Sequence, residues 1–386
     1  MLNANMKVVM IGQKGIPAIF GGIERHVEEL SNELTRTGVD VSVYCRRWYC
    51  ADREEHGNVK KIFMPTLHTK HLDAISHTFI STLHAIFVEK PDIIHYHGVG
   101  PSLCAWIPRL LAPRTRVVVT FHSIDRNHDK WGLFARIMLR AGEWTACRYA
   151  DRTIAVSQML ENYCRDVYGI DASYLPNGVT TFPDSNPGLL TEWNLAPGRY
   201  LLFVGRLIRL KGVHTLISAY RQLPAETRER YPLIVTGEAC DQKYVRELTA
   251  LARGANVKFV GNQTGAKLAA LYRGAALFVQ PSECESMPIV VLEAASENIP
   301  IVASDIAAHK EILNGEGTYF ESKNILELAA CLQETLGDLD GAKERAKITG
   351  ARILNSFAWD KIASDTKDVY LATAPALVAL SETEEI

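Results

Sequence analysis

Short β-branched segments alternate with stretches of helical length from one end of the chain to the other, and this alternation constrains the fold more than any other feature. Parallel strands need long crossover connections, usually helices, so the alternation favours parallel sheets covered by helices on both faces. We predict strands at 7–12, 40–45, 60–64, 92–97, 116–122 and 152–157, and then at 199–205, 232–237, 256–261, 276–282 and 299–304. The sequence therefore predicts an α/β fold with two doubly wound sheets.

A linker separates the two sets of strands. Residues 180–198 contain three prolines and no helical period, which is typical of a connection. The chain of 386 residues also exceeds what one ordinary core holds. We predict a first domain over 1–185 and a second over 186–357, with a C-terminal helix at about 358–376 that packs back on the first. Ligands of such sheets bind at the carboxyl ends of the strands.

Composition excludes several classes of protein. The net charge of -2 is too small for a nucleic-acid footprint. The apolar segments fall short of the roughly 18 residues of a membrane span, and the N-terminus lacks the zones of a signal peptide, so we expect a cytoplasmic location. The eight cysteines include no CxxC pair, which argues against a disulfide framework or a zinc site.

The glycine pair Gly21 and Gly22 follows the first predicted strand and is expected to open a helix. Free amides at a helix N-terminus can bind an anion such as phosphate. A tight turn permitted by glycine is the alternative. The segment is not a GxGxxG motif, and no acidic residue ends the second strand, so the pattern does not indicate a dinucleotide site.

Basic side chains also follow predicted strands. His122 ends the strand at 116–122, Arg206 follows the strand at 199–205, and Lys211 begins the next helix. Two cations beside a helix N-terminus suit a diphosphate, because charge-assisted donors bind phosphate strongly. The alternatives are a packing role for His122 and surface solvation for Arg206 and Lys211.

Two carboxylates bracket the start of an apolar helix in the segment PSECESMPIVVLE. Pro288 suits the first helical position, which places Glu285 in the preceding loop and Glu293 about 1.5 turns into the helix. The free amides of Ile289 and Val290 lie between them, and a carboxylate can accept two hydrogen bonds from a vicinal diol. The pair could therefore hold the ribose and hexose of a nucleotide sugar. The alternatives are charge placement near a helix N-terminus for Glu285 and an exposed position for Glu293.

Taken together, these segments resemble the retaining family-4 glycosyltransferases of the GT-B fold across nearly the whole chain. Within that family, the chain is most similar to bacterial polysaccharide-assembly enzymes of the rhamnosyl- and mannosyltransferase type. The resemblance implies two Rossmann-like domains facing a central cleft, the first on the acceptor side and the second binding the nucleotide sugar. It rests on FGG, HYHG, VTFHS, ADRTIAVS, LPNGV, VGRLIRLKG, VKFVG, LYRGAALFVQPS and ESMPIVVLEA, and for the narrower group on GQKGIPAIFGGIERHVEEL and DKWG.

The resemblance also implies a role for each candidate residue. Arg206 and Lys211 would neutralise the donor diphosphate, and Glu293 would bind the ribose hydroxyls. Glu285 would hold the donor sugar, and His122 would line the reaction centre. The segment ESMP departs from the Glu-Gly-Phe-Gly that is more common in the family. The implied catalytic residues are His122, Arg206, Lys211 and Glu285, and the implied donor-binding residues are Gly21, Gly22, Arg206, Lys211, Glu285, Ser286, Met287, Pro288, Ile289, Val290 and Glu293.

We therefore expect a hexosyltransferase that acts on a nucleotide-diphosphate sugar and a saccharide or lipid-linked saccharide acceptor in bacterial cell-surface polysaccharide synthesis. The resemblance implies retention of anomeric configuration. We expect no metal or other cofactor, because Arg206 and Lys211 can take the electrostatic role of a metal, and the DLD string at 338–340 is typical of a turn. The alternatives are a nucleotide-sugar epimerase, a phosphorylase or a catalytically silent subunit.

A lipid-linked acceptor would bring the first domain to the inner membrane surface. Two stretches mix cations with large apolar groups, as in proteins that bind anionic membranes. Burial of their apolar side chains in the core is the alternative. The residues are Arg46, Arg47, Trp48, Lys60 and Lys61 in the first stretch, and Lys130, Trp131, Phe134, Arg136, Met138, Arg140 and Trp144 in the second.

Overall fold

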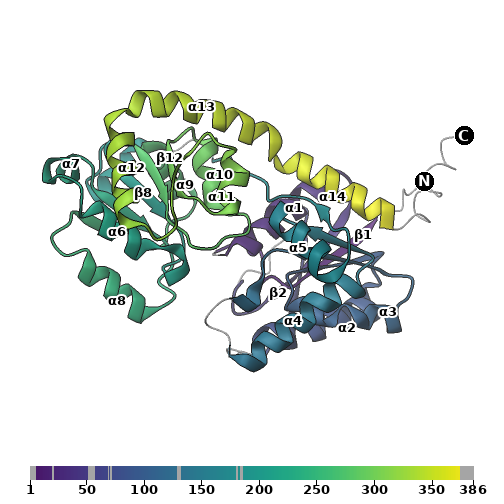
Figure 1. Ribbon diagram of the computed structural model, residues 1–386. Helices are drawn as coiled ribbons and strands as arrows, with labels where there is room; N and C mark the ends of the chain where they lie inside the picture. Colours follow the sequence, from purple (N-terminus) through teal and green to yellow (C-terminus); the bar gives the residue numbers. More distant parts are fainter. Residues whose placement is uncertain are drawn as a thin grey trace, which may run out of the picture. The chain divides into compact units, whose positions relative to one another are not determined.

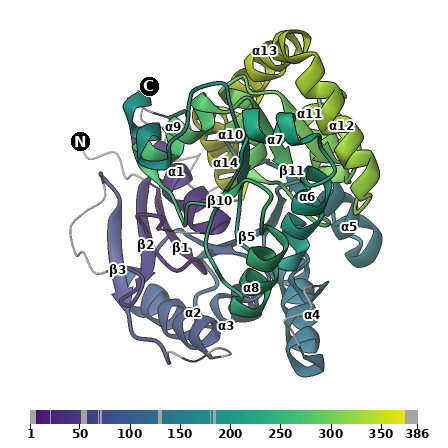
Figure 2. The same ribbon diagram turned by 90° about the vertical axis from the view of Figure 1, so that its left-hand side faces the viewer.

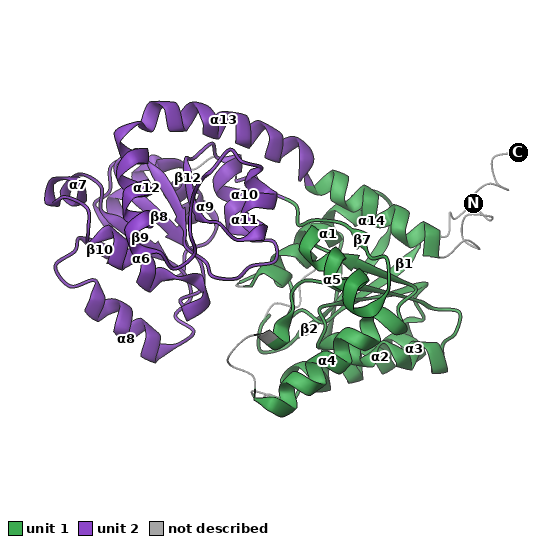
Figure 3. Ribbon diagram, viewed as in Figure 1, with its two compact units in different colours: residues 1–178, 359–386 green, residues 179–358 purple. Residues whose placement is uncertain are grey.

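The computed structural model describes residues 6–19, 21–50, 57–67, 69, 72–127, 132–179, 181–182 and 186–373. It divides the chain into two compact units, with residues 1–178 and 359–386 in unit 1 and residues 179–358 in unit 2 (Figure 3). The boundary precedes the predicted one at 185/186, because Val179 pairs with the far end of unit 2. Its amide donates to the carbonyl of Phe357 at 2.7 Å, and it forms a bridge with Ala358.

Unit 1 is built on a parallel sheet of seven strands in the order β3-β2-β1-β4-β5-β6-β7. Figure 2 labels β3, β2, β1 and β5 of this sheet. All six strands predicted for the first half are present, and the two-residue β7 is an addition that is too short for a periodic signal. The strands are β1 Lys7–Ile11, β2 Asp40–Arg46, β3 Lys60–Met64, β4 Ile93–His97, β5 Arg116–Phe121, β6 Arg152–Ala155 and β7 Ser173–Tyr174.

Helices cover both faces of the unit 1 sheet, with α1 and α14 packed side by side on one face and α2, α3 and α4 on the other (Figure 1). The Lys367 ammonium of α14 donates to the carbonyl of Thr37, just beyond α1, at 2.7 Å. The helices are α1 Gly22–Arg36, α2 Asp73–His84 with a π-helical turn Ala85–Glu89, α3 Trp106–Leu111, α4 Leu133–Arg148, α5 Gln158–Tyr168 and α14 Trp359–Thr373, with 3₁₀ turns at Pro101–Cys104 and Asp125–Asn127.

Local sequence signals explain where helices such as α5 begin and end. The Ser157 hydroxyl accepts a hydrogen bond from the Leu160 amide at 3.3 Å, which satisfies one of the free amides of the first turn. Gly169 ends the helix in the left-handed conformation, which glycine adopts without steric cost. In unit 2, Asp338 caps α13 (Leu339–Ser356) in the same way by accepting from the Gly341 amide at 3.1 Å, so the DLD string is a helix start.

Unit 2 contains a second parallel sheet, of six strands in the order β10-β9-β8-β11-β12-β13. The five strands predicted for the second half are all present, and β13 is an additional edge strand of three residues. The strands are β8 Leu201–Val204, β9 Leu233–Thr236, β10 Val257–Phe259, β11 Leu277–Gln280, β12 Ile301–Ser304 and β13 Thr318–Phe320.

The second half of the predicted linker is part of unit 2. Residues Pro187–Trp193 form a 3₁₀ helix whose Leu190 is buried, and the Gly198 amide donates to the carbonyl of Gly274 at 2.7 Å. Prolines hide this packed segment from a search for helical periodicity. The helices of unit 2 are α6 Val213–Tyr220, α7 Ala225–Arg230, α8 Gln242–Leu251, α9 Gly265–Gly274, α10 Ile289–Ser296, α11 Ala307–Leu313, α12 Ile325–Gly337 and α13 Leu339–Ser356, with a 3₁₀ turn Arg209–Lys211.

Each sheet has one point at which its strand order reverses. In unit 1 this point lies between β1 and β4, and in unit 2 between β8 and β11. The loops that follow these strands leave in opposite directions and open a crevice at the carboxyl ends, where open α/β sheets bind ligands. Ligand-binding residues are therefore expected at these two edges.

Candidate functional site

In unit 2, the loops that follow β8 and β11 are fastened to each other at the switch point. The amide of Glu283 donates to the carbonyl of Leu210 at 2.8 Å. Gly212 adopts a φ of +68°, and a Cβ there would lie 2.0 Å from the carbonyl oxygen of Pro281. Only glycine permits this conformation and this approach without strain. The contact holds Lys211 over the loop that carries Glu285.

Lys211 and Glu285 form an ion pair and hydrogen bond, and the Ser282 hydroxyl donates to the same Glu285 oxygen at 2.8 Å. Burial opposes ionisation of Glu285, but the charge of Lys211 and the hydrogen bonds outweigh it and hold the pKa of Glu285 below its usual range. Glu285 therefore carries its negative charge at neutral pH. The sequence prediction that these two residues lie at one site agrees with this geometry.

Arg206 follows β8 and is exposed. No ion pair connects its guanidinium to any other residue in the described part of the chain. Neighbouring Arg209, by contrast, pairs with Glu247. Arg206 is thus a cation at the edge of the switch point that remains available for an anion.

Glu293 lies on α10 and is buried, so the alternative of an exposed position is wrong. It accepts a hydrogen bond from the Tyr272 hydroxyl at 2.9 Å. The predicted helical position of Pro288 is also wrong by one residue. Pro288 has an extended ψ of 107° and caps a helix that begins at Ile289, so Glu293 lies slightly closer to the helix start than expected.

The other predicted donor-binding residues surround the start of α10. Ser286 is half-buried and Met287 is buried in the preceding loop. Ile289 and Val290 are the first two residues of α10, where amides lack partners from an earlier helical turn. Those amides lie between Glu285 and Glu293 along the chain, as the sequence predicts.

In unit 1, Gly21 and Gly22 open α1, as predicted. Gly21 has a φ of +106°, and a Cβ there would lie 1.9 Å from Oε2 of Glu24. Glu24 also accepts from the Lys14 amide at 3.1 Å. A carboxylate therefore folds back over this helix start, and an anion that approached Gly22 would meet its negative charge.

His122 follows β5 and belongs to a cluster of buried histidines. Its Nε2 lies 3.3 Å from Nδ1 of His97 at the end of β4. The ring of His26, from α1, contacts His122 edge-on with centroids 4.7 Å apart. Burial and the neighbouring histidines lower the pKa of His97 and His122 well below the usual value, and burial lowers that of His26 to about 4. All three rings are neutral at pH 7.

Family comparisons match both units. The family described as Glycosyltransferase Family 4 matches residues 20–181, and that described as Glycosyl transferases group 1 matches residues 194–351. The chain is a family-4 glycosyltransferase.

Relatives of this glycosyltransferase have names that describe different reactions. Glycogen synthase of Mycobacterium tuberculosis is 27% identical over 407 residues, which cover 95% of each chain. Phosphatidyl-myo-inositol mannosyltransferase of Mycobacterium leprae is 28% identical over 290 residues, which cover 73% of this chain and 74% of the relative.

Solved structures share the fold of this glycosyltransferase. Sucrose-phosphate synthase from Thermosynechococcus elongatus has a TM-score of 0.82 at 22% identity, covering 96% of this chain and 100% of the other. Anabaena HepE in complex with UDP-glucose has a TM-score of 0.78 at 21% identity, covering 95% and 100%. The prediction of a GT-B fold with two Rossmann-like domains is confirmed.

Sequence reasoning missed several polar residues of the glycosyltransferase site. His309 on α11 is buried and interacts electrostatically with Glu285 and Lys211, and burial lowers its pKa. Its Nε2 has no hydrogen-bond partner among the described residues. His309 follows the predicted strand at 299–304 closely, so the carboxyl-end rule could have found it. Tyr272 and Ser282 carried no such signal.

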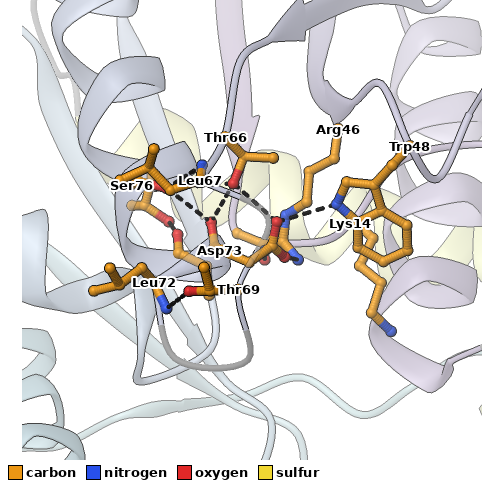
Figure 4. A network of polar contacts seen from close by, with 12 residues as sticks. Lys14, Arg46, Trp48, Thr66, Leu67, Thr69, Leu72, Asp73 and Ser76 are labelled. Carbon is orange, nitrogen blue, oxygen red and sulfur yellow. Dashed lines mark hydrogen bonds and ion pairs between the residues drawn. The ribbon is translucent and has the colours of Figure 1, made fainter.

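A polar network follows β2 and β3 in unit 1 and overturns part of the predicted membrane contact (Figure 4). Arg46 is buried, and its Nη1 donates to Asp73 Oδ2 at 2.7 Å. The Trp48 indole and the Thr66 hydroxyl donate to Asp73 Oδ1 at 3.1 and 2.8 Å. Arg46 is thus a structural ion-pair partner and cannot reach a lipid, although Arg47 is exposed.

The residues named in the second predicted stretch are exposed where the structure describes them; Lys130 and Trp131 lie outside the described residues. On α4, Leu133 is 78% exposed, Phe134 77% and Ile137 58%, and Met138 and Trp144 are exposed too. Core burial, the alternative for these apolar side chains, is therefore wrong. No helix in the described ranges is long and apolar enough to cross a membrane. Among described residues, the exposed large apolar side chains of unit 2 are only Ile325, Leu326, Ile348 and Leu354.

Proposed function

We propose that this glycosyltransferase moves a hexose from a nucleotide-diphosphate sugar to a saccharide or lipid-linked saccharide during assembly of a bacterial cell-surface polysaccharide. The observation that carries the proposal is the grouping of Lys211, Glu285 and Arg206 at the switch point of unit 2. Two cations there suit a diphosphate, and carboxylates on both sides of the α10 start suit the two sugar rings.

In the proposed reaction, the bond between the anomeric carbon and the phosphate oxygen breaks, and its electron pair leaves with the nucleoside diphosphate. Arg206 and Lys211 stabilise the negative charge that grows on the leaving group. The acceptor hydroxyl oxygen attacks the same face of the sugar and passes its proton to the departing phosphate oxygen. Glu285 is engaged with Lys211 and Ser282, which supports such a retaining route over attack by this carboxylate. We propose that His122 also takes part in the reaction, as the resemblance implies.

We propose that catalysis requires no metal, because fixed cations and helix amides can provide the charge that a metal would provide. Activity is expected to survive EDTA. A strict requirement for Mn²⁺ or Mg²⁺, restored by titration after chelation, would refute this part of the proposal.

A lipid-linked acceptor is supported by unit 1. The exposed apolar side chains of α4 lie among Arg136, Arg140 and Arg148, a combination suited to an anionic membrane surface. One relative is named for a lipid acceptor, phosphatidyl-myo-inositol. We propose that unit 1 binds the inner membrane surface peripherally through α4.

The experiment that tests the proposed function starts with a thermal-shift screen of UDP-, GDP-, ADP- and dTDP-sugars. A donor at 100 times its dissociation constant stabilises the folded protein against unfolding by about 2.7 kcal/mol. Product analysis of the hit, with and without acceptor, then separates the reaction classes. Transfer with retained configuration supports the proposal, whereas an epimer or a sugar phosphate without acceptor indicates an epimerase or phosphorylase. Failure to turn over any donor indicates a silent subunit.

A further inference from the structure

The histidine cluster of unit 1 has the composition of a metal site. His26, His97 and His122 each place one ring nitrogen within 4.8 Å of the others. They come from α1, from the end of β4 and from the residue after β5, so three separate elements converge. All three side chains are buried, with exposed fractions of 3%, 1% and 8%. Only one of them, His122, has a role in the proposed reaction.

The hydrogen bonds of the cluster leave lone pairs available. Nδ1 of His26 lies 2.8 Å from Oδ1 of Asn177, and because an amide oxygen only accepts, the ring donates from Nδ1. Nε2 of His26 is then an acceptor, and within the described part of the chain it has no partner. Nε2 of His97 is also buried without a partner there, so it can carry the ring proton and leave the lone pair on Nδ1. Neutral imidazoles ligate metals without first losing a proton.

We propose that His26, His97 and His122 bind one Zn²⁺ ion. With Zn–N distances of about 2.0–2.1 Å, two nitrogens of a tetrahedral site lie about 3.3–3.4 Å apart. Nδ1 of His97 and Nε2 of His122 already lie 3.3 Å apart, so the ion replaces their hydrogen bond, and the ligand atom of His26 lies within 4.8 Å of both. Asn177 supplies the outer hydrogen bond that typically fixes the ring of a metal-ligating histidine. Three protein ligands leave the fourth position for water.

The consequence for activity rests on the proposed function. An ion at this site occupies a lone pair of His122 and places a positive charge beside the reaction centre. Zn²⁺ is therefore an inhibitor of transfer rather than a cofactor, and chelation relieves the inhibition.

The binding test uses calorimetric titration of Zn²⁺ into the chelator-treated full chain, so its result does not depend on activity. We expect one site that weakens at least tenfold in His26→Gln and in His97→Gln. Asn177→Ala, which keeps all three ligands, is expected to weaken it by roughly 10- to 100-fold. The matched control is His77→Gln, a buried histidine on α2 outside the cluster, which should bind Zn²⁺ like the parent chain.

Circular dichroism verifies that each variant is folded before titration. Absence of a site in the parent chain overturns the proposal. The proposal is also overturned if the affinity for Zn²⁺ is unchanged both in folded Asn177→Ala and in either of the two folded histidine variants. If the site is present but Zn²⁺ does not slow transfer, the metal site stands and the role of His122 in the proposed function is wrong.

Discussion

Lys211 and Glu285 follow different strands of unit 2, yet they form an ion pair in which their side chains are only 15% and 12% exposed. Glu283 and Gly212 hold the two loops together, so the pair is fixed by backbone contacts as well as by charge. A ligand with a diphosphate would meet a lysine that is already oriented. The same burial makes the two residues interdependent.

Removal of Lys211 is expected to destabilise unit 2, because Glu285 would keep its charge in a largely buried position. Breaking a buried pair in this way typically costs about 3–5 kcal/mol. Lys211→Ala should therefore lower the unfolding free energy more than the double variant Lys211→Ala/Glu285→Gln. Denaturant unfolding of the two single variants, the double variant and the parent chain gives the coupling energy.

The coupling should depend on pH with a defined sign. Lys211 and the hydrogen bonds hold the pKa of Glu285 below its usual range, so the stabilisation is present above the ordinary carboxyl pKa and is lost as the pH falls below it. If Lys211→Ala and Glu285→Gln have additive effects on the unfolding free energy at pH 7, the two side chains are not coupled and this prediction is wrong.

Substitutions of the two carboxylates of the donor site, Glu285 and Glu293, are expected to affect nucleotide binding differently. Glu293→Gln should weaken the binding of a nucleoside diphosphate by roughly tenfold, about 1.4 kcal/mol, since Glu293 is proposed to hold the ribose. Glu285→Gln should leave that affinity nearly unchanged and impair use of the whole donor. Calorimetric titration decides, with the exposed Glu247→Gln as control. Equal losses for Glu285→Gln and Glu293→Gln would rule out the division of roles.

Gly212 is predicted to be more sensitive to alanine than another glycine with the same backbone conformation. Gly212 and Gly254 have φ values of +68° and +70°, but a Cβ at Gly254 meets nothing within 4 Å. The left-handed conformation costs alanine about 1–2 kcal/mol at either site. Gly212→Ala adds a clash with Pro281 and displaces Lys211, so both melting temperature and turnover should fall further than in Gly254→Ala. Indistinguishable variants would show that the loop contact is unimportant.

The sequence predicts both sheets because buried parallel strands are continuous apolar runs of sufficient length. It misses β7 and β13, which have only two and three residues, and the 3₁₀ helix Pro187–Trp193, which lies in a proline-containing segment that resembles a linker. Edge strands and packed turns depend on their neighbours more than on their own pattern.

Part of the candidate site could likewise be predicted from the sequence, and part could not. Arg206, Lys211 and Glu285 could be predicted because each follows a strand at the edge where ligands bind. The contact of Lys211 with Glu285 joins positions 74 residues apart, and no local pattern encodes it. The burial of Arg46 could not be predicted either, because it depends on Asp73 from a separate helix.

The exposed face of α4 is expected to bind anionic lipid. Basic residues near an anionic surface contribute about 1 kcal/mol each, and inserted apolar side chains add burial. Co-sedimentation with anionic liposomes should exceed that with neutral ones and decline with salt. Leu133→Ser/Phe134→Ser should lose it, whereas the control Leu326→Ser/Ile348→Ser on unit 2 should not. Equal sedimentation of both double variants would exclude α4 as the contact.

Arg206 and Arg209 provide the most direct test of a diphosphate site in unit 2. Both are exposed arginines of the segment that follows β8, but Arg209 is paired with Glu247 and Arg206 has no ion-pair partner among the described residues. Neither substitution by alanine should unfold the protein, because surface charges contribute little to stability. The measurement is turnover at saturating donor for Arg206→Ala beside Arg209→Ala. We predict that Arg206→Ala loses roughly 100- to 1,000-fold, the usual effect of removing one preorganised donor, and that Arg209→Ala stays close to the parent rate. Near-normal turnover in Arg206→Ala, or equal losses in the two variants, would contradict the proposed site.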